Sequence, residues 1–95
     1  MQGRTHYANG QPVARQEGDT LTYFFKTGLK KAEGTSINDV MQGEWRFWRE
    51  TGGLWQVGHF REGVKHGPWV RYGRDGSVEK AVTFDNGKAV KGRTG

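Results

Sequence analysis

The chain has 95 residues, of which 33% are hydrophobic and 26% charged, and its formal net charge at pH 7 is +5. Because it contains no cysteine, a disulfide scaffold, a thiolate zinc site and a cysteine nucleophile are excluded. No apolar run follows Met1–Tyr7, and none approaches the roughly 18 residues of a membrane span. We therefore expect neither a signal peptide nor a transmembrane segment, and a cytoplasmic location.

Short strands separated by tight turns are the predicted structure. Sixteen glycines would suit disorder, but twelve aromatic side chains argue against it, because disordered chains usually lack them. Runs rich in aromatic and β-branched residues predict strands over Leu21–Lys26, Glu44–Arg49, Leu54–Arg61, Trp69–Tyr72 and Val78–Asp85. The expected fold class is all-β: an elongated antiparallel meander of tandem β-hairpin repeats, with roughly six or seven strands in a single sheet.

Dipeptides that contain glycine predict the turns. Asn9-Gly10, Asp75-Gly76 and Asn86-Gly87 suit type I′ hairpins, in which both central residues need positive φ. Glycine supplies the same left-handed conformation in Thr27-Gly28, Thr51-Gly52 and Glu62-Gly63. Because these signals recur throughout the chain, we expect hairpins that are local in sequence.

A repeat of 24 residues relates Gly43–His66 to Gly67–Val90. The matched pairs are Gly43 and Gly67, Trp45 and Trp69, Trp48 and Tyr72, Gly52 and Gly76, Phe60 and Phe84, and Gly63 and Gly87. Upstream, Leu21, Phe24 and Gly28 continue the pattern, but Ser36 and Asp39 take the places of Phe60 and Gly63. Tyr7–Gly10 resembles Phe84–Gly87. We expect one domain, 1–95, with units at about 1–18 (partial), 19–42 (degenerate), 43–66 and 67–90, and a tail at 91–95.

The string Gly-x-Trp-x-x-(Trp/Tyr)-x-x-x-Gly, followed by an aromatic residue, two residues and glycine, resembles the MORN repeat (membrane occupation and recognition nexus). It looks closest to the bacterial variant of antitoxin-like proteins. Two copies carry it, Gly43–Gly63 and Gly67–Gly87, about half of the chain. The resemblance implies β-hairpin arrays without an active site, with roles in protein–protein contact, dimerisation or binding of anionic lipid. In some bacterial members it implies neutralisation of a toxin.

The repeated aromatic residues are the expected core. They are Trp45, Trp48, Trp69, Tyr72, Phe60 and Phe84. Trp45 and Trp48 are three residues apart, so a regular strand would place them on opposite faces unless a bulge intervenes. Trp55 and Phe47 have no aromatic counterpart in the next unit, where Glu79 and Arg71 stand. We therefore expect these two rings to be exposed for binding.

Basic residues flank the aromatic ones and complete the candidate binding site. The predicted partner-binding residues are Arg46, Phe47, Arg49, Trp55, Arg71 and Arg74. Lys26, Lys30 and Lys31 form a further cluster. Such a pattern suits an acidic protein surface or single-stranded nucleic acid, and it equally suits a solvated strand face with cation–π contacts.

No catalytic residue, cofactor or metal site is predicted. His6, His59 and His66 share no ligand spacing, and no serine–histidine–acid arrangement is visible. The leading hypothesis is a non-enzymatic protein–protein interaction module that occludes an acidic surface, as an antitoxin-like or immunity-like inhibitor would. The alternative is polyanion binding, to nucleic acid or anionic lipid, through a basic and aromatic sheet face. A third hypothesis is self-association through unpaired sheet edges.

Overall fold

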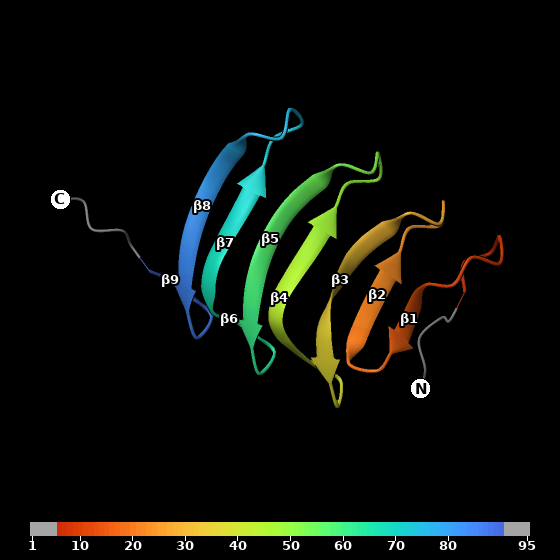
Figure 1. Ribbon diagram of the computed structural model, residues 1–95, viewed down its shortest axis with the longest axis horizontal. Coiled ribbons are helices and arrows are strands. Elements are labelled where there is room, and N and C mark those ends of the chain that lie inside the picture. Colours follow the sequence, from red (N-terminus) through yellow and green to blue (C-terminus); the bar gives the residue numbers. More distant parts are fainter. Residues whose placement is uncertain (1–5, 91–95) are drawn as a thin grey trace.

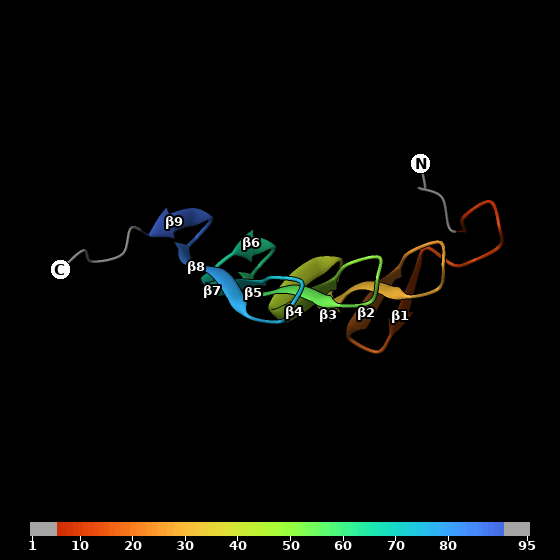
Figure 2. The same ribbon diagram turned by 90° about the horizontal axis from the view of Figure 1, so that it is seen from above.

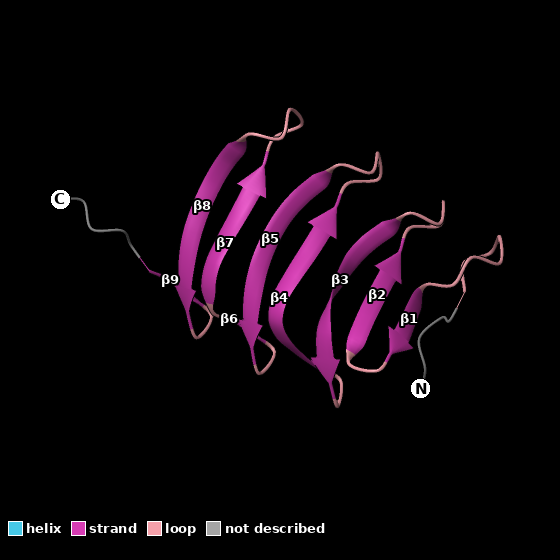
Figure 3. Ribbon diagram, viewed as in Figure 1, coloured by secondary structure: helices cyan, strands magenta, loops and turns pink. Residues whose placement is uncertain are grey.

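The computed structural model describes residues 6–90, which form one open antiparallel sheet (Figure 1). Its strands are β1 (Ala14–Glu17), β2 (Thr20–Phe24), β3 (Lys30–Ile37), β4 (Val40–Trp48), β5 (Leu54–Arg61), β6 (Val64–Lys65), β7 (Gly67–Tyr72), β8 (Val78–Asp85) and β9 (Lys88–Val90). They pair in chain order, with β6 and β7 pairing successive parts of β5. Over the described range the elements are strands and loops (Figure 3), and no helix there could cross a membrane.

The all-β meander in a single sheet is confirmed, but the strand count was wrong: the sheet has nine strands, more than the six or seven predicted. β1, β3, β6 and β9 lie outside the predicted runs because they are polar or only two or three residues long. The strands nevertheless follow the repeat. β3, β5 and β8 begin at Lys30, Leu54 and Val78, at intervals of 24 residues. The backbone therefore keeps the 24-residue period through the degenerate unit 19–42, where most of the aromatic positions are lost.

Two kinds of turn alternate along the chain, one at each end of the strands. The two-residue turns have positive φ at both central residues in Asn38-Asp39 (51° and 67°), Glu62-Gly63 (52° and 84°) and Asn86-Gly87 (48° and 91°). The type I′ prediction for Asn86-Gly87 is thus supported. Asp39 stands at the repeat position of Gly63, and it has the same left-handed backbone conformation although it is not a glycine.

The longer turns span 7–11, 25–29, 49–53 and 73–77, and each is closed by the same two backbone hydrogen bonds. Only the fourth residue of each turn, a glycine such as Gly52 or Gly76, has positive φ, as in three-residue hairpin loops that end in a left-handed residue. The type I′ predictions for Asn9-Gly10 and Asp75-Gly76 are therefore wrong. Tyr7–Gly10 has the hydrogen bonds of these longer turns rather than those of Phe84–Gly87.

The sheet buries its core without a second layer, as its edge-on view shows (Figure 2). Trp45 is 0% exposed and Trp69 is 6% exposed, because neighbouring rings on the same face cover them. Phe60 meets both indoles edge-on, with centroid distances of 6.2 and 5.2 Å, and Phe84 meets Trp69 at 6.2 Å. Of the predicted core rings, Trp45 and Trp69 are buried, and Phe60 and Phe84 are half-buried against them. We call this surface the tryptophan face.

Glycine makes this burial possible. Each indole lies against the glycine of the preceding strand, so that a Cβ on Gly34 would stand 2.3 Å from the Trp45 ring, and one on Gly58 would stand 2.1 Å from the Trp69 ring. The indole Nε1 atoms of Trp45 and Trp69 donate to the backbone oxygens of Thr35 and His59, both at 2.9 Å. The indole rings of Trp45 and Trp69 thus lie flat against the sheet backbone, and this contact provides burial that a second layer would otherwise supply.

Two of the expected core rings lie outside this stack. Trp48 and Tyr72 are half-buried, and within residues 6–90 neither contacts another aromatic ring. Trp48 follows an irregularity in the β4–β5 register, and its ring lies 5.9 Å from Lys30 Nζ. The bulge that could have joined Trp48 to Trp45 exists but does not bring their rings together.

Candidate binding clefts

Four of the six predicted partner-binding residues come together at the end of the sheet that carries the longer turns. Arg49 follows β4, Arg71 lies in β7, Arg74 lies in the 73–77 turn and Trp55 lies in β5. All four line one shallow cleft of about 820 Å³ beside the 73–77 turn. We call this group of four residues and the space around it the arginine cleft.

Trp55 reaches the cleft from a bulge that recurs in the repeat. In the β4–β5 pair, Phe47 opposes Gln56 and Trp48 opposes Leu54, so Trp55 is the unpaired extra residue. The β2–β3 and β7–β8 pairs leave out Lys31 and Glu79 in the same way. Bulges redirect side chains without ending a strand. The same bulge therefore carries lysine at 31, tryptophan at 55 and glutamate at 79.

The hollow between the 49–53 and 73–77 turns continues the arginine cleft. It has a volume of about 560 Å³ and is lined by Arg49, Arg74, Leu54 and Tyr72 among others. Arg49 Nη2 donates to the backbone oxygen of Tyr72 at 3.0 Å, which joins the two hairpins, while its Nε is buried with no hydrogen-bond partner in residues 6–90. One part of the Arg49 guanidinium, Nη2, therefore stabilises the contact between the two hairpins, whereas its Nε–H donor has no acceptor in the described residues.

The lining of the arginine cleft includes two carboxylates, Asp75 and Glu79, but neither forms an ion pair with its arginines in the described residues. Across the described residues, Arg49, Arg71 and Arg74 form no ion pair within 4.0 Å. The nearby Asp75 carboxylate instead accepts hydrogen bonds from the Ser77 hydroxyl at 2.7 Å and the Ser77 amide at 3.0 Å. These bonds hold the pKa of Asp75 below its ordinary value. The guanidinium groups of Arg71 and Arg74 thus remain available to an anionic partner, and that of Arg49 is available in part.

Arg46 and Phe47 do not belong to this cleft. Arg46 lies 3.7 Å from a Glu44 carboxylate oxygen and opposes Glu33 in the register, so acidic neighbours already surround it. Phe47 stacks on Trp69 at 5.7 Å and lies 6.3 Å from Trp45. Phe47 and Trp55 are both half-buried, so neither ring is fully exposed, although Trp55 still lines the arginine cleft. For Phe47 the reason is packing in the core.

A second cleft, which the sequence did not predict, lies at the same end of the sheet. It has a volume of about 640 Å³, and its lining includes Tyr7, Phe25, Lys26, Lys31 and Glu50. The Tyr7 hydroxyl donates to the Phe24 backbone oxygen at 2.8 Å, which ties the first turn to the next. Lys31 Nζ lies 5.8 Å from the Phe25 ring. The shared aromatic-x-x-Gly spacing of Tyr7–Gly10 and Phe25–Gly28 was the available signal. We call this space the lysine cleft.

Hydrogen bonds to backbone occupy two of the histidines. His59 Nδ1 lies 3.1 Å from the Pro68 oxygen, and His66 Nδ1 accepts from the Asn86 amide at 3.1 Å. Over residues 6–90, no group of three or more histidine, aspartate or glutamate side chains is placed to hold a metal ion. The chemistry concentrated at the turn end is therefore that of cations and aromatic rings.

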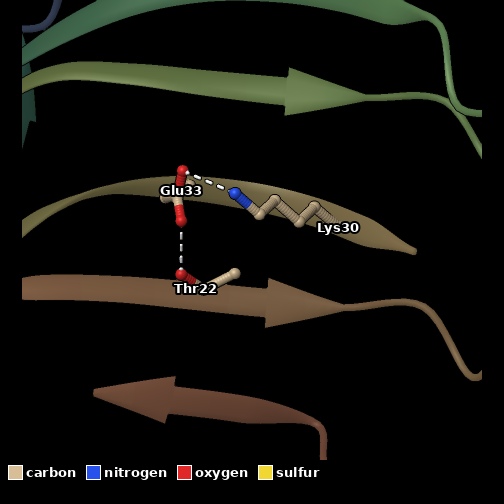
Figure 4. Close-up of polar contacts among 3 residues, drawn as sticks. All are labelled: Thr22, Lys30 and Glu33. Atoms are coloured by element: carbon tan, nitrogen blue, oxygen red, sulfur yellow. Dashed lines mark hydrogen bonds and ion pairs between the residues drawn. The ribbon is translucent and has the colours of Figure 1, made fainter. Parts of the chain in front are cut away.

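Glu33, on the strand next to the arginine-bearing hairpins, is held ionised by its neighbours (Figure 4). The buried Thr22 hydroxyl on β2 donates to Glu33 Oε2 at 2.7 Å, and Lys30 Nζ donates to Oε1 at 3.2 Å. Chiefly through the Thr22 hydrogen bond, these contacts lower the pKa of Glu33 from its ordinary value of 4.5.

We expect Thr22→Val to make stability less dependent on pH in acid. A depressed carboxylate pKa adds stability that is present above pH 4.5 and lost as the pH falls through the folded-state value. Without the Thr22 hydroxyl the Glu33 pKa rises towards 4.5, and about 1 kcal/mol of stability at pH 7 is lost. Urea unfolding at pH 7 and pH 3 measures both effects. An unchanged difference between the two pH values would show that Thr22 does not stabilise the carboxylate.

The fold and its clefts define a class of protein: a single-layer sheet of 24-residue hairpin repeats with cationic, aromatic clefts along one row of turns. Compared with known protein families, curated proteins and solved structures, the chain gives no match.

Proposed function

We propose that the protein is a non-enzymatic protein-binding module that captures an acidic surface of a partner at the arginine cleft. One observation carries this proposal: three guanidinium groups gather around Trp55 without an ion pair inside residues 6–90. Tryptophan and arginine are the residue types most enriched among the dominant contacts of protein interfaces. Arginine also pairs with carboxylates through two parallel hydrogen bonds.

Catalysis is not part of the proposed role. The cations of the arginine cleft are arginines, which stay protonated in proteins and cannot exchange protons as a general acid or base. Asp75 is ionised near neutral pH, because its ordinary pKa of 3.8 is lowered further by hydrogen bonds from Ser77, so it cannot act as a proton donor there. The action that these groups support is occlusion, in which binding covers a working surface of the partner, and it needs no cofactor.

The repeat pattern of Gly43–Gly63 and Gly67–Gly87 supports a MORN-like assignment within this proposal. In that assignment the protein is an antitoxin-like or immunity-like inhibitor that acts in the cytoplasm. Because one fold can serve many functions, the proposed binding role is argued from the residues of the arginine cleft. The repeat pattern only suggests which kind of binding protein this is.

Polyanion binding is the second candidate, and it is favoured by a surface that shares only Arg71 with the lining of the arginine cleft. On the tryptophan face, Lys65 Nζ lies 4.7 Å from the Trp69 ring and 4.9 Å from the Phe84 ring. Arg71 and Lys80 line the same hollow, whose volume is about 130 Å³. Bases could stack there beside phosphate-binding cations. Such binding weakens steeply with salt because counterions are released.

Affinity capture tests the proposed function. The tagged chain is incubated with a nuclease-treated lysate of its host at moderate salt, and bound proteins are identified by mass spectrometry. We expect one protein in near-stoichiometric amount, retained at 0.3 M salt and released by Arg71→Gln/Arg74→Gln. Recovery of nucleic acid instead, in a parallel capture without nuclease, would replace the proposal with the polyanion role.

A further inference from the structure

The two clefts at the turn end lie on either side of a single turn. Glu50 lines the lysine cleft, whereas Arg49, Thr51 and Gly53 line the hollow that continues the arginine cleft. All of these residues belong to the 49–53 turn. In Figure 1 the longer turns form a row along one end of the sheet, so the clefts are neighbours in that row.

The spacing of the clefts follows from the sheet. Adjacent strands are about 4.8 Å apart, so successive longer turns, two strands apart, are separated by about 10 Å. The lysine cleft begins at the 7–11 turn and the arginine cleft ends at the 73–77 turn. Their centres are therefore about 10 to 20 Å apart, the length of three to six residues of extended polypeptide at about 3.3 Å per residue.

Each cleft combines cations with aromatic surface and with carboxylate. The lysine cleft has Lys26 and Lys31 beside Phe25 and Tyr7, and Glu50 stands at its far side. The arginine cleft has its three arginines beside Trp55, with Asp75 and Glu79 in its lining. A ligand must therefore present negative charge at intervals and tolerate, or donate hydrogen bonds to, the carboxylates between.

We propose that one extended acidic segment of the partner polypeptide crosses the 49–53 turn and places carboxylates in both clefts. This rests on the proposed function and specifies the form of the partner. Polypeptide fits better than single-stranded nucleic acid, because its backbone N–H groups can donate to Glu50 and Glu79, whereas phosphodiester groups only accept and would be repelled. The footprint thus extends beyond the arginine cleft to residues at the start of the described chain.

Synthetic peptides test this geometry on the full chain. Each peptide carries two Asp-Glu pairs joined by a Gly-Ser linker of zero to ten residues, and a peptide with one pair serves as reference. Binding is measured by fluorescence anisotropy at 50 mM salt. We expect affinity to peak at linkers of about one to four residues, which place the centres of the two pairs three to six residues apart, and to be at least about 10-fold above the reference, because the second contact becomes intramolecular.

Charge-matched variants locate the two contacts. Lys26→Gln/Lys31→Gln and Arg71→Gln/Arg74→Gln should each abolish the gain from the second pair. Arg61→Gln/Lys88→Gln removes the same charge at the opposite end of the strands and should leave the linker optimum in place. Equal weakening by all three variants would reduce the effect to net charge and overturn the proposal.

Two other outcomes separate this inference from the proposed function. If the linker length has no effect while the captured partner still depends on Arg71 and Arg74, the bridging is wrong and the module remains. If a twelve-nucleotide oligo-dT binds more tightly than the best peptide, with steeper salt dependence, the ligand is nucleic acid and the polypeptide assignment fails. Peptides that do not bind at all, beside a captured partner, also overturn the bridging.

Discussion

Gly58→Ala is expected to lower the free energy of unfolding by about 2–4 kcal/mol. The new Cβ would stand 2.1 Å from the Trp69 ring, so the indole must leave its seat on β5. Overpacking of this kind costs roughly 1–3 kcal/mol, and loss of the Trp69 Nε1 hydrogen bond to the His59 oxygen adds about 1 kcal/mol. Thermal unfolding should shift downwards by roughly 10–25 °C for a chain of this size.

Gly53→Ala is the matched control. A Cβ at Gly53 meets nothing within 4 Å, and this glycine does not have positive φ. Its substitution should change stability by no more than about 0.5 kcal/mol. If Gly58→Ala unfolds at the same temperature as Gly53→Ala, the indole does not rest on the backbone as described.

Arg71→Gln/Arg74→Gln should weaken binding of the captured partner at least about 100-fold without lowering stability. Each anchor arginine of an interface is worth roughly 1.4 kcal/mol or more, which is tenfold in affinity. Both side chains are exposed, and over the described part of the chain neither makes a hydrogen bond or ion pair. Titration calorimetry measures the affinity, and thermal unfolding confirms that the fold is kept.

Arg61→Gln/Lys88→Gln provides the comparison for charge. Both residues are exposed and lie beside the two-residue turns at the other end of the strands. A partner that docks in the arginine cleft should lose little affinity for this variant, because long-range charge effects are screened by salt. An equal loss in both variants would argue against a localised site. Arg49 is left unchanged because its hydrogen bond to Tyr72 joins two hairpins.

The sequence predicts the stacked tryptophans better than it predicts the glycines against which their indole rings lie. Trp45 and Trp69 are separated by the 24-residue period of the repeat, which indicates that the two rings occupy equivalent positions in the sheet. That each indole lies on Gly34 or Gly58 depends on cross-strand register, and the register is shifted by irregularities between Gly34 and Thr35. Such shifts arise from pairing between strands, which no single stretch of sequence encodes. The same is true of Phe47, whose place in the stack depends on its neighbours.

The arginine cleft was predictable in its members but not in its boundaries. Four of the predicted binding residues flank or interrupt the repeated aromatic positions, and the structure brings these four together: Arg49, Trp55, Arg71 and Arg74. Arg46 also lies beside aromatic residues in the sequence, yet its neighbours are acidic: Glu44 on the same strand and Glu33 opposite it on β3. The lysine cleft was missed because its first wall, Tyr7, belongs to a turn that precedes Phe25–Leu29 by 18 residues rather than 24.

Val82 sets a limit on how this sheet can grow. It occupies on β8 the repeat position that Gly34 and Gly58 hold on β3 and β5, opposite Trp69 in the register. A copy of the repeat added beside the outer edge of β8 would bring its own indole against the Val82 side chain, where the earlier strands offer bare backbone. A further unit of the Gly43–Gly63 type could therefore not lay its indole on β8 as Trp69 lies on β5. Val82 thus ends the series of bare-backbone positions on which the indoles of this sheet are stacked.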